Sequence, residues 1–94
     1  MFGSVFQMRP KAGMAQQLRD TMMSPDRRPA GMVTAYLLTE GGDASVWGLA
    51  VFESEAAYRA NAADPAQDQH YQAFRALLES DPEWHDGAIQ QRAE

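Results

Sequence analysis

Cysteine is missing from the sequence altogether. Its absence excludes disulfides, thiolate metal sites, cysteine nucleophiles and iron–sulfur clusters, and it fits a reducing compartment such as the cytoplasm. Long apolar runs are missing too, because no segment approaches the roughly 20 residues that a membrane-spanning helix needs. The first ten residues lack the basic region and apolar core of a signal peptide. We therefore expect a soluble, cytoplasmic protein with no membrane partner.

Basic residues are few and scattered. The chain carries 8 Lys and Arg residues against 13 Asp and Glu residues, for a formal net charge of −5. No basic stripe forms that could follow a phosphate backbone, so we expect no nucleic-acid partner. The preference for Arg over Lys is typical of a GC-rich bacterial genome.

The alternation of side chains predicts four strands, and helical spacing predicts two helices. The strands span 2–9, 32–40, 45–53 and, more weakly, 84–91. The apolar stripe of the first helix recurs every four residues, at Met14, Leu18 and Met22. The second helix follows Ser54, a favourable N-cap residue, and runs toward Ser80. Pro65 breaks or kinks it, because proline lacks the amide hydrogen that a helix interior needs.

This β-α-β-β-α-β order predicts a single domain over residues 1–94 with an α+β, ferredoxin-like fold. A four-stranded antiparallel sheet would carry two helices on one face. The strand 45–53 is apolar on both sides, with Trp47, Leu49 and Val51 on one face and Val46, Ala50 and Phe52 on the other. Two helices cover only one face, so something else must cover the second. We expect a homodimer through the sheet faces; the alternative is a monomer with an unusually apolar sheet.

Three segments carry a resemblance to a known family. The run 51–58 (VFESEAAY), the pair Asp64-Pro65 and the run 81–87 (DPEWHDG) are similar to the antibiotic biosynthesis monooxygenase family of the dimeric α+β barrel superfamily. The resemblance implies a dimeric α+β barrel, and the family includes cofactor-free oxygenases, haem-degrading enzymes and members of unknown role. Similar members often have His where Asn61 stands. Gln7 takes the place of the Asn that the haem-degrading branch has on its first strand, which disfavours haem degradation.

Two polar residues are the candidate catalytic groups. His70 lies four residues before Phe74, so it shares or flanks the buried stripe of the second helix. Its reference pKa near working pH suits a general base, although a structural histidine is the open alternative. Asn61 is a candidate hydrogen-bond donor in a pocket beside the alanine-rich start of that helix. Alternatively, it is only a residue at the kink before Pro65. We expect His85 at the surface or the dimer edge.

Aromatic residues could line an apolar pocket for a polycyclic or phenolic ligand. We expect Trp47 and Phe74 as pocket walls and Tyr36 or Tyr71 as further donors, with plain core packing as the alternative. Two histidines fifteen residues apart, without cysteine, predict no metal site, and no nucleotide fingerprint is present.

The sequence supports a cofactor-independent monooxygenase acting on an electron-rich aromatic or polyketide-like small molecule. The first alternative is a non-catalytic module that binds a small apolar ligand or only dimerises. The second is the disfavoured haem-degrading enzyme. For the favoured function we expect no cofactor.

Overall fold

The computed structural model describes residues 1–93, and Glu94, the last residue of the predicted domain, lies outside the described residues. The elements, in chain order, are β1 (Phe2–Met8), α1 (Ala15–Met22), β2 (Met32–Glu40), β3 (Ser45–Phe52), α2 (Glu55–Ala62), α3 (Pro65–Arg75) and β4 (Glu83–Ala88). Over residues 1–93, no helix combines the length and the apolar character needed to cross a membrane.

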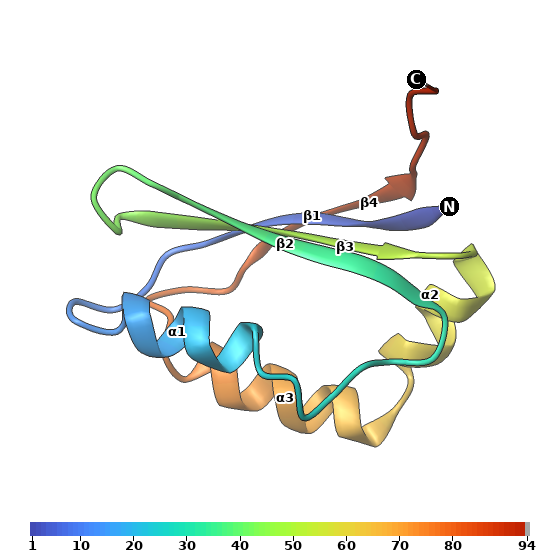
Figure 1. The fold of residues 1–94 in the computed structure, drawn as a ribbon. Helices are drawn as coiled ribbons and strands as arrows, with labels where there is room; N and C mark the ends of the chain where they lie inside the picture. The colour runs from blue at the N-terminus through green and yellow to red at the C-terminus, as the bar shows by residue number, and fades with distance from the viewer. Residues whose placement is uncertain (94) are drawn as a thin grey trace.

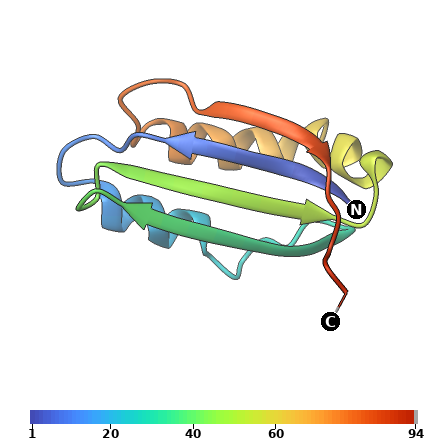
Figure 2. The same cartoon turned by 90° about the horizontal axis from the view of Figure 1, so that it is seen from above.

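The four strands form one antiparallel sheet in the order β2-β3-β1-β4. All three helices lie on the same side of this sheet (Figure 1). Seen from above, the opposite face is open except at one end, where the segment that follows β4 passes over it (Figure 2). The predicted α+β, ferredoxin-like arrangement is therefore confirmed. The last strand covers Glu83–Ala88 rather than 84–91.

The second predicted helix is two helices, α2 and α3. Ser54 caps the start of α2, where its Oγ accepts a hydrogen bond of 3.1 Å from the Ala57 amide. Asp64 caps α3 in the same way, accepting a bond of 2.9 Å from the Ala66 amide. Pro65 occupies the first turn of α3, where its missing amide hydrogen costs nothing. The predicted break at Pro65 is confirmed, and the chain uses it to start a new helix.

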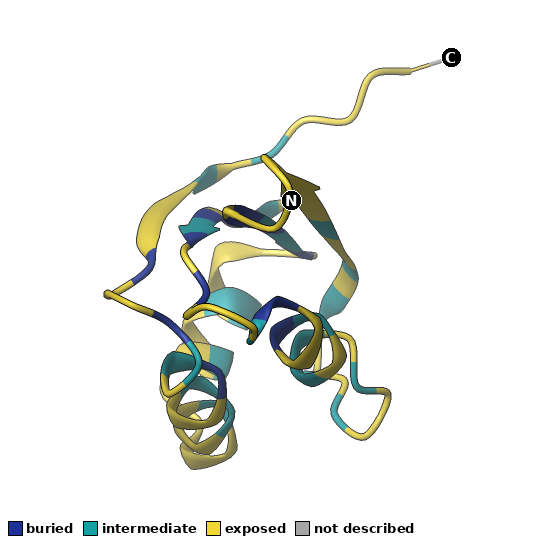
Figure 3. Cartoon of the chain, turned by 90° about the vertical axis from the view of Figure 1, so that its left-hand side faces the viewer, coloured by how far each residue is buried: buried dark blue, intermediate teal, exposed yellow. Residues whose placement is uncertain are grey.

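The hydrophobic core lies between the sheet and the helices. Its buried members come from both layers: Phe6, Met8, Leu18, Val46, Phe74 and Leu78. Figure 3 shows buried positions turned toward the interior and exposed positions on the outward sides of the helices. Gly48 makes room for this packing, because a β-carbon there would lie 2.3 Å from Cζ of Phe6.

The open face of the sheet carries large apolar side chains, here called the outer face: Val5, Tyr36, Leu38, Trp47 and Leu49. Strand register places them together, since Val5 and Tyr36 both pair with Leu49, and Leu38 pairs with Trp47. Val5, Tyr36 and Leu38 keep 42%, 62% and 57% of their surface exposed. A row of apolar residues this exposed marks an interaction surface.

Candidate functional site

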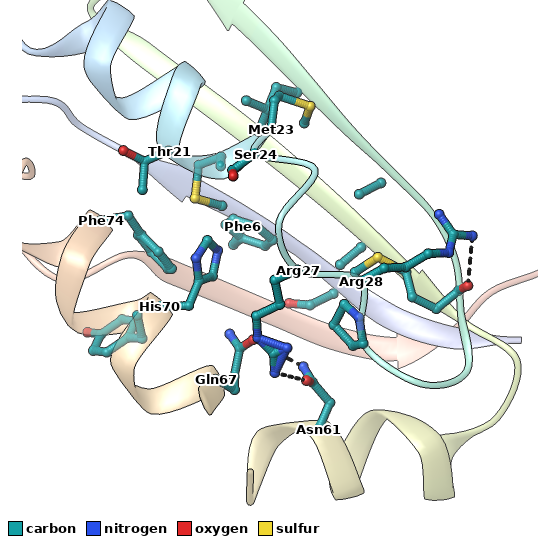
Figure 4. Close-up of a pocket in the computed structure, with 18 of the residues that line it drawn as sticks. Phe6, Thr21, Met23, Ser24, Arg27, Arg28, Asn61, Gln67, His70 and Phe74 are labelled. Atoms are coloured by element: carbon teal, nitrogen blue, oxygen red, sulfur yellow. Dashed lines mark hydrogen bonds between the residues drawn. The ribbon is translucent and has the colours of Figure 1, made fainter. Parts of the chain in front are cut away.

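A cavity of about 1210 Å³ lies between the sheet and the helix layer. Its floor is formed by side chains from the inner face of the sheet, including Phe6, Phe52 and Trp84. Its walls come from α2, α3, the end of α1 and the loop 23–31 that follows α1. Most of the surface that lines it is apolar, although many polar side chains border it, and a mostly apolar hollow is typical of a small-molecule site. Figure 4 shows the polar groups of this wall.

His70 stands on the wall of this cavity, one helical turn before Phe74 on α3. The two rings meet edge to face, with centroids 5.3 Å apart. Burial lowers the pKa of His70 below its ordinary value, and the nearby positive charge of Arg27 lowers it further. The imidazole is therefore neutral at neutral pH and able to accept a proton.

Asn61 reaches the same cavity from α2 and belongs to a short chain of hydrogen bonds. Its Oδ1 accepts a bond of 2.7 Å from Nη2 of Arg27, and its Nδ2 donates one of 3.3 Å to Oε1 of Gln67. Figure 4 shows Arg27 descending from its loop toward Asn61, with His70 on the adjacent helix. The amide retains one hydrogen for a ligand, because Nδ2 has two.

The predicted aromatic residues divide between the two faces of the sheet. Phe74 is 1% exposed in the core and lines the cavity, and Tyr71 lines it beside Phe74 with ring centroids 5.2 Å apart. Tyr36 borders the cavity from edge strand β2. However, the alternation of side chains along that strand turns its side chain to the outer face.

The expectation that Trp47 forms a pocket wall is wrong. Trp47 is absent from the cavity lining and pairs in register with Gln7 and Leu38, on the outer face. Its indole Nε1 donates to Oε1 of Glu40 instead. Alternation along a strand separates two faces, but it does not say which face the helices will cover.

The other tryptophan, Trp84, takes the place that was expected of Trp47. It pairs in register with Phe6, and the two ring centroids lie 4.7 Å apart on the inner face. Ser4, two residues before Phe6, lines the same cavity and has a buried Oγ without a hydrogen-bond partner. The sequence does place Ser4 on the face of Phe6, because side chains alternate along β1. Placing Trp84 on that face also requires the register between β1 and β4.

Tyr58 lies at the α2 end of the cavity and donates a hydrogen bond of 2.9 Å to Oδ1 of Asp86. Burial raises the pKa of Tyr58 above its ordinary value, and the carboxylate of Asp86 raises it further. The phenol therefore stays protonated at neutral pH, and its proton is committed to Asp86. It contributes surface to the cavity rather than a base.

Residues 1–93 contain no cluster of three or more His, Asp or Glu side chains placed to hold a metal ion. His85 lies apart from the cavity on β4, where its Nε2 is 3.2 Å from Oε1 of Glu83 and both side chains are exposed. His70, Asn61, Gln67 and Arg27, by contrast, all line the cavity. The sequence does not reveal the role of Arg27, because its loop has no helical or strand periodicity from which the direction of a side chain can be predicted.

Comparisons with known proteins agree on the fold. No protein-family model and no curated protein matches the sequence. Among solved structures, the chain is similar to SnoaB, a cofactor-independent oxygenase from Streptomyces nogalater, at 24% identity over 97% of this chain and 94% of that one (TM-score 0.81). It is similar to the monooxygenase ActVA-Orf6 of Streptomyces coelicolor, in complex with nanaomycin D, at 22% identity over 99% and 90% (TM-score 0.83). Rv0793 from Mycobacterium tuberculosis matches at 16% identity over 99% and 98% (TM-score 0.76).

Proposed function

We propose that this protein is a cofactor-independent monooxygenase that oxidises an electron-rich aromatic or polyketide-like small molecule. The observation that carries the proposal is the half-buried imidazole of His70 on the wall of a large cavity with mostly apolar surface, and its lowered pKa favours the form that accepts a proton. Two of the solved structures that share this fold are an oxygenase and a monooxygenase, which supports the same reaction class.

The reaction needs little from the protein beyond a base, a hydrogen-bond donor and a dry cavity. Dioxygen is a triplet and reacts slowly with closed-shell molecules, whereas an ionised aromatic can pass it an electron directly. His70 takes the proton from an acidic C–H bond of the substrate. The resulting carbanion gives one electron to dioxygen, and the two radicals combine into a C–O bond. The protonated His70 returns its proton to the peroxide.

The hydroperoxide then breaks down within the same cavity. Loss of the second proton from the same carbon, with cleavage of the O–O bond, leaves a carbonyl group and releases water. One oxygen atom thus enters the product and the other leaves as water, with the substrate as the only reductant. The free N–H group of Asn61 donates a hydrogen bond to the peroxide oxygen, and the aromatic residues exclude bulk water.

We further propose that the working unit is a homodimer joined through the outer faces of two sheets. Val5, Tyr36 and Leu38 leave apolar surface uncovered on a face that the three helices do not reach. A chain of about this size buries only about 65% of the surface of its unfolded form, so covering this face adds considerably to stability. A second copy supplies a self-complementary cover through a two-fold axis.

Oxygen uptake tests the reaction. The dimeric protein is mixed with a panel of hydroxylated anthrones and dihydroquinones in an oxygen electrode, without added metal or flavin. We expect uptake with at least one substrate class, and a loss of roughly 100-fold or more in His70→Gln. His85→Gln, which changes the other histidine, is the matched control and should retain activity.

Two results would contradict the reaction. Absence of uptake across the panel by folded protein rejects it. Tight ligand binding without turnover supports the alternative, a non-catalytic module that binds a small apolar ligand.

A further inference from the structure

Arg27 is a cation in the cavity wall without an anion beside it. Its one hydrogen bond is to a neutral group, the amide oxygen of Asn61 at 2.7 Å. None of the ion pairs within residues 1–93 includes Arg27. Its Nε is buried and has no hydrogen-bond partner. Arg27 as a whole is half-buried, and even a partly buried charge without a counter-ion lowers the stability of a fold.

Four of the other arginines have partners of another kind, and the remaining two, Arg9 and Arg92, are exposed to solvent. Arg19, Arg59 and Arg75 each pair with a carboxylate. Arg28, the next residue in the same loop, donates bonds of 3.2 Å to the carbonyl oxygens of Met32 and Val33, which ties the loop to β2. Arg27 performs neither task.

The guanidinium of Arg27 is held in place while most of its donors stay free. Asn61 uses one of its five N–H groups, and Gln67 holds Asn61 in turn at 3.3 Å. Figure 4 shows this chain beside His70, below the loop that carries Arg27. A guanidinium fixed in this way offers a planar fork of donors, the geometry that suits the paired oxygens of a carboxylate.

Three aspartates also border the cavity, and their placement does not cancel the charge of Arg27. Asp20, Asp26 and Asp68 are all exposed, whereas Arg27 is half-buried. Charges at the exposed rim are screened by water and salt, and a half-buried charge is screened much less. The three aspartates and Arg28 therefore lie at the solvated rim, and Arg27 is the cation that lies deeper in the wall.

We infer that the ligand of this cavity is an aromatic molecule with an anionic oxygen, a carboxylate or an ionised phenol, and that Arg27 binds that oxygen. The inference rests on the proposed function in taking this cavity as the substrate site, and it deepens it by naming the substrate class. Arg27 selects the ligand and fixes its orientation, with the apolar ring body against Phe6, Phe74 and Trp84. Asn61 holds Arg27 through Oδ1 and keeps one N–H group for the ligand, and Gln67 holds Asn61.

Calorimetric titration with two small probes tests this inference without any oxygen chemistry. The probes are 2-naphthoate and its neutral analogue 2-naphthamide, which have the same ring system and nearly the same shape. We expect the wild-type protein to prefer 2-naphthoate. In Arg27→Gln, binding of 2-naphthoate should weaken by roughly tenfold or more, since hydrogen bonds to charged groups are the strong ones, while binding of 2-naphthamide should change little.

Arg59→Gln is the control, because it removes the same charge at an exposed position outside the cavity lining. It should leave the preference for the carboxylate intact. Arg27→Lys retains the charge but loses the fork, so it should recover only part of the affinity. Circular dichroism of each variant establishes that a loss of binding is not a loss of fold.

A phenol probe distinguishes the two sources of the anionic oxygen. 4-Nitrophenol absorbs in the visible range only when ionised, so its spectrum reports the pKa of the bound phenol. If Arg27 binds phenolates, that pKa falls on binding to the wild-type protein and not to Arg27→Gln; an unchanged pKa restricts the site to carboxylates.

Three results would overturn the inference as a whole. These are equal binding of the two naphthalene probes by the wild-type protein, failure of 2-naphthoate to bind it, or an equal loss of carboxylate preference in Arg59→Gln. Each can occur with oxygen uptake intact, so failure of the inference and failure of the proposed reaction are distinguishable.

Discussion

Truncation of Leu38 to alanine tests whether the outer face is a dimer interface. Full burial of a leucine side chain contributes about 1.5–3 kcal/mol. Leu38 still exposes 57% of its surface, so covering the remainder contributes roughly 1–1.5 kcal/mol. A two-fold interface uses each residue twice, which doubles the loss to roughly 2–3 kcal/mol. The dissociation constant of Leu38→Ala should therefore rise roughly 30- to 150-fold.

Sedimentation equilibrium over a range of protein concentrations measures this constant directly. Met23→Ala is the control, because Met23 is similarly exposed at 48% but follows α1 on the helix side of the molecule. It should dimerise like the wild-type protein. A wild-type protein that is monomeric at tens of micromolar concentration would show that the outer face is not a dimer interface. Equal dissociation constants for Leu38→Ala and Met23→Ala would show the same.

Two further predictions concern the cavity. Because the pKa of His70 is lowered in the fold, its contribution to stability is fully present above about pH 6.5. Below that pH, His70 is protonated in the unfolded chain but still neutral in the folded protein. The free energy of unfolding should therefore fall by at most about 1.4 kcal/mol for each unit that the pH is lowered. Urea titrations of His70→Gln should lack this contribution to the slope. Gly48→Ala should destabilise by roughly 1–3 kcal/mol, because the new methyl group collides with Phe6. In Gly87→Ala the new methyl group meets nothing within 4 Å, so this variant should be nearly neutral in the same thermal melts. A Gly48→Ala variant as stable as Gly87→Ala would show that the ring of Phe6 moves aside freely.

Most of the fold could be predicted from the sequence because its signals are local. Alternation in β1 and β3, the glycine turn between β2 and β3, the N-cap at Ser54 and the break at Pro65 each act over a few residues. The last strand was misplaced by one residue at its start and three at its end, since strand ends depend on pairing with a distant partner. β4 ends at Ala88, which pairs with Phe2 at the start of β1.

The candidate site was only partly predictable, for a different reason. The helical spacing of His70 and Phe74 does specify one side of α3, and the structure places both on the cavity wall. Trp47 was assigned to the wrong face because β3 carries apolar side chains on both faces, and the sequence does not show which of them the helices cover. Arg27 lies in a loop without regular structure, where the direction of a side chain depends on tertiary contacts such as the bond to Asn61.

The closeness of Arg27 and His70 has a consequence for the proposed chemistry. The positive charge of Arg27 contributes to the lowered pKa of His70, so in the empty cavity proton transfer to His70 is opposed by a cation. An anionic oxygen bound to Arg27 neutralises that cation, which makes the imidazolium form of His70 more favourable. The base therefore gains strength when a substrate of the inferred class occupies the site. A neutral aromatic of the same shape would fill the cavity without this gain and would react more slowly even when fully bound.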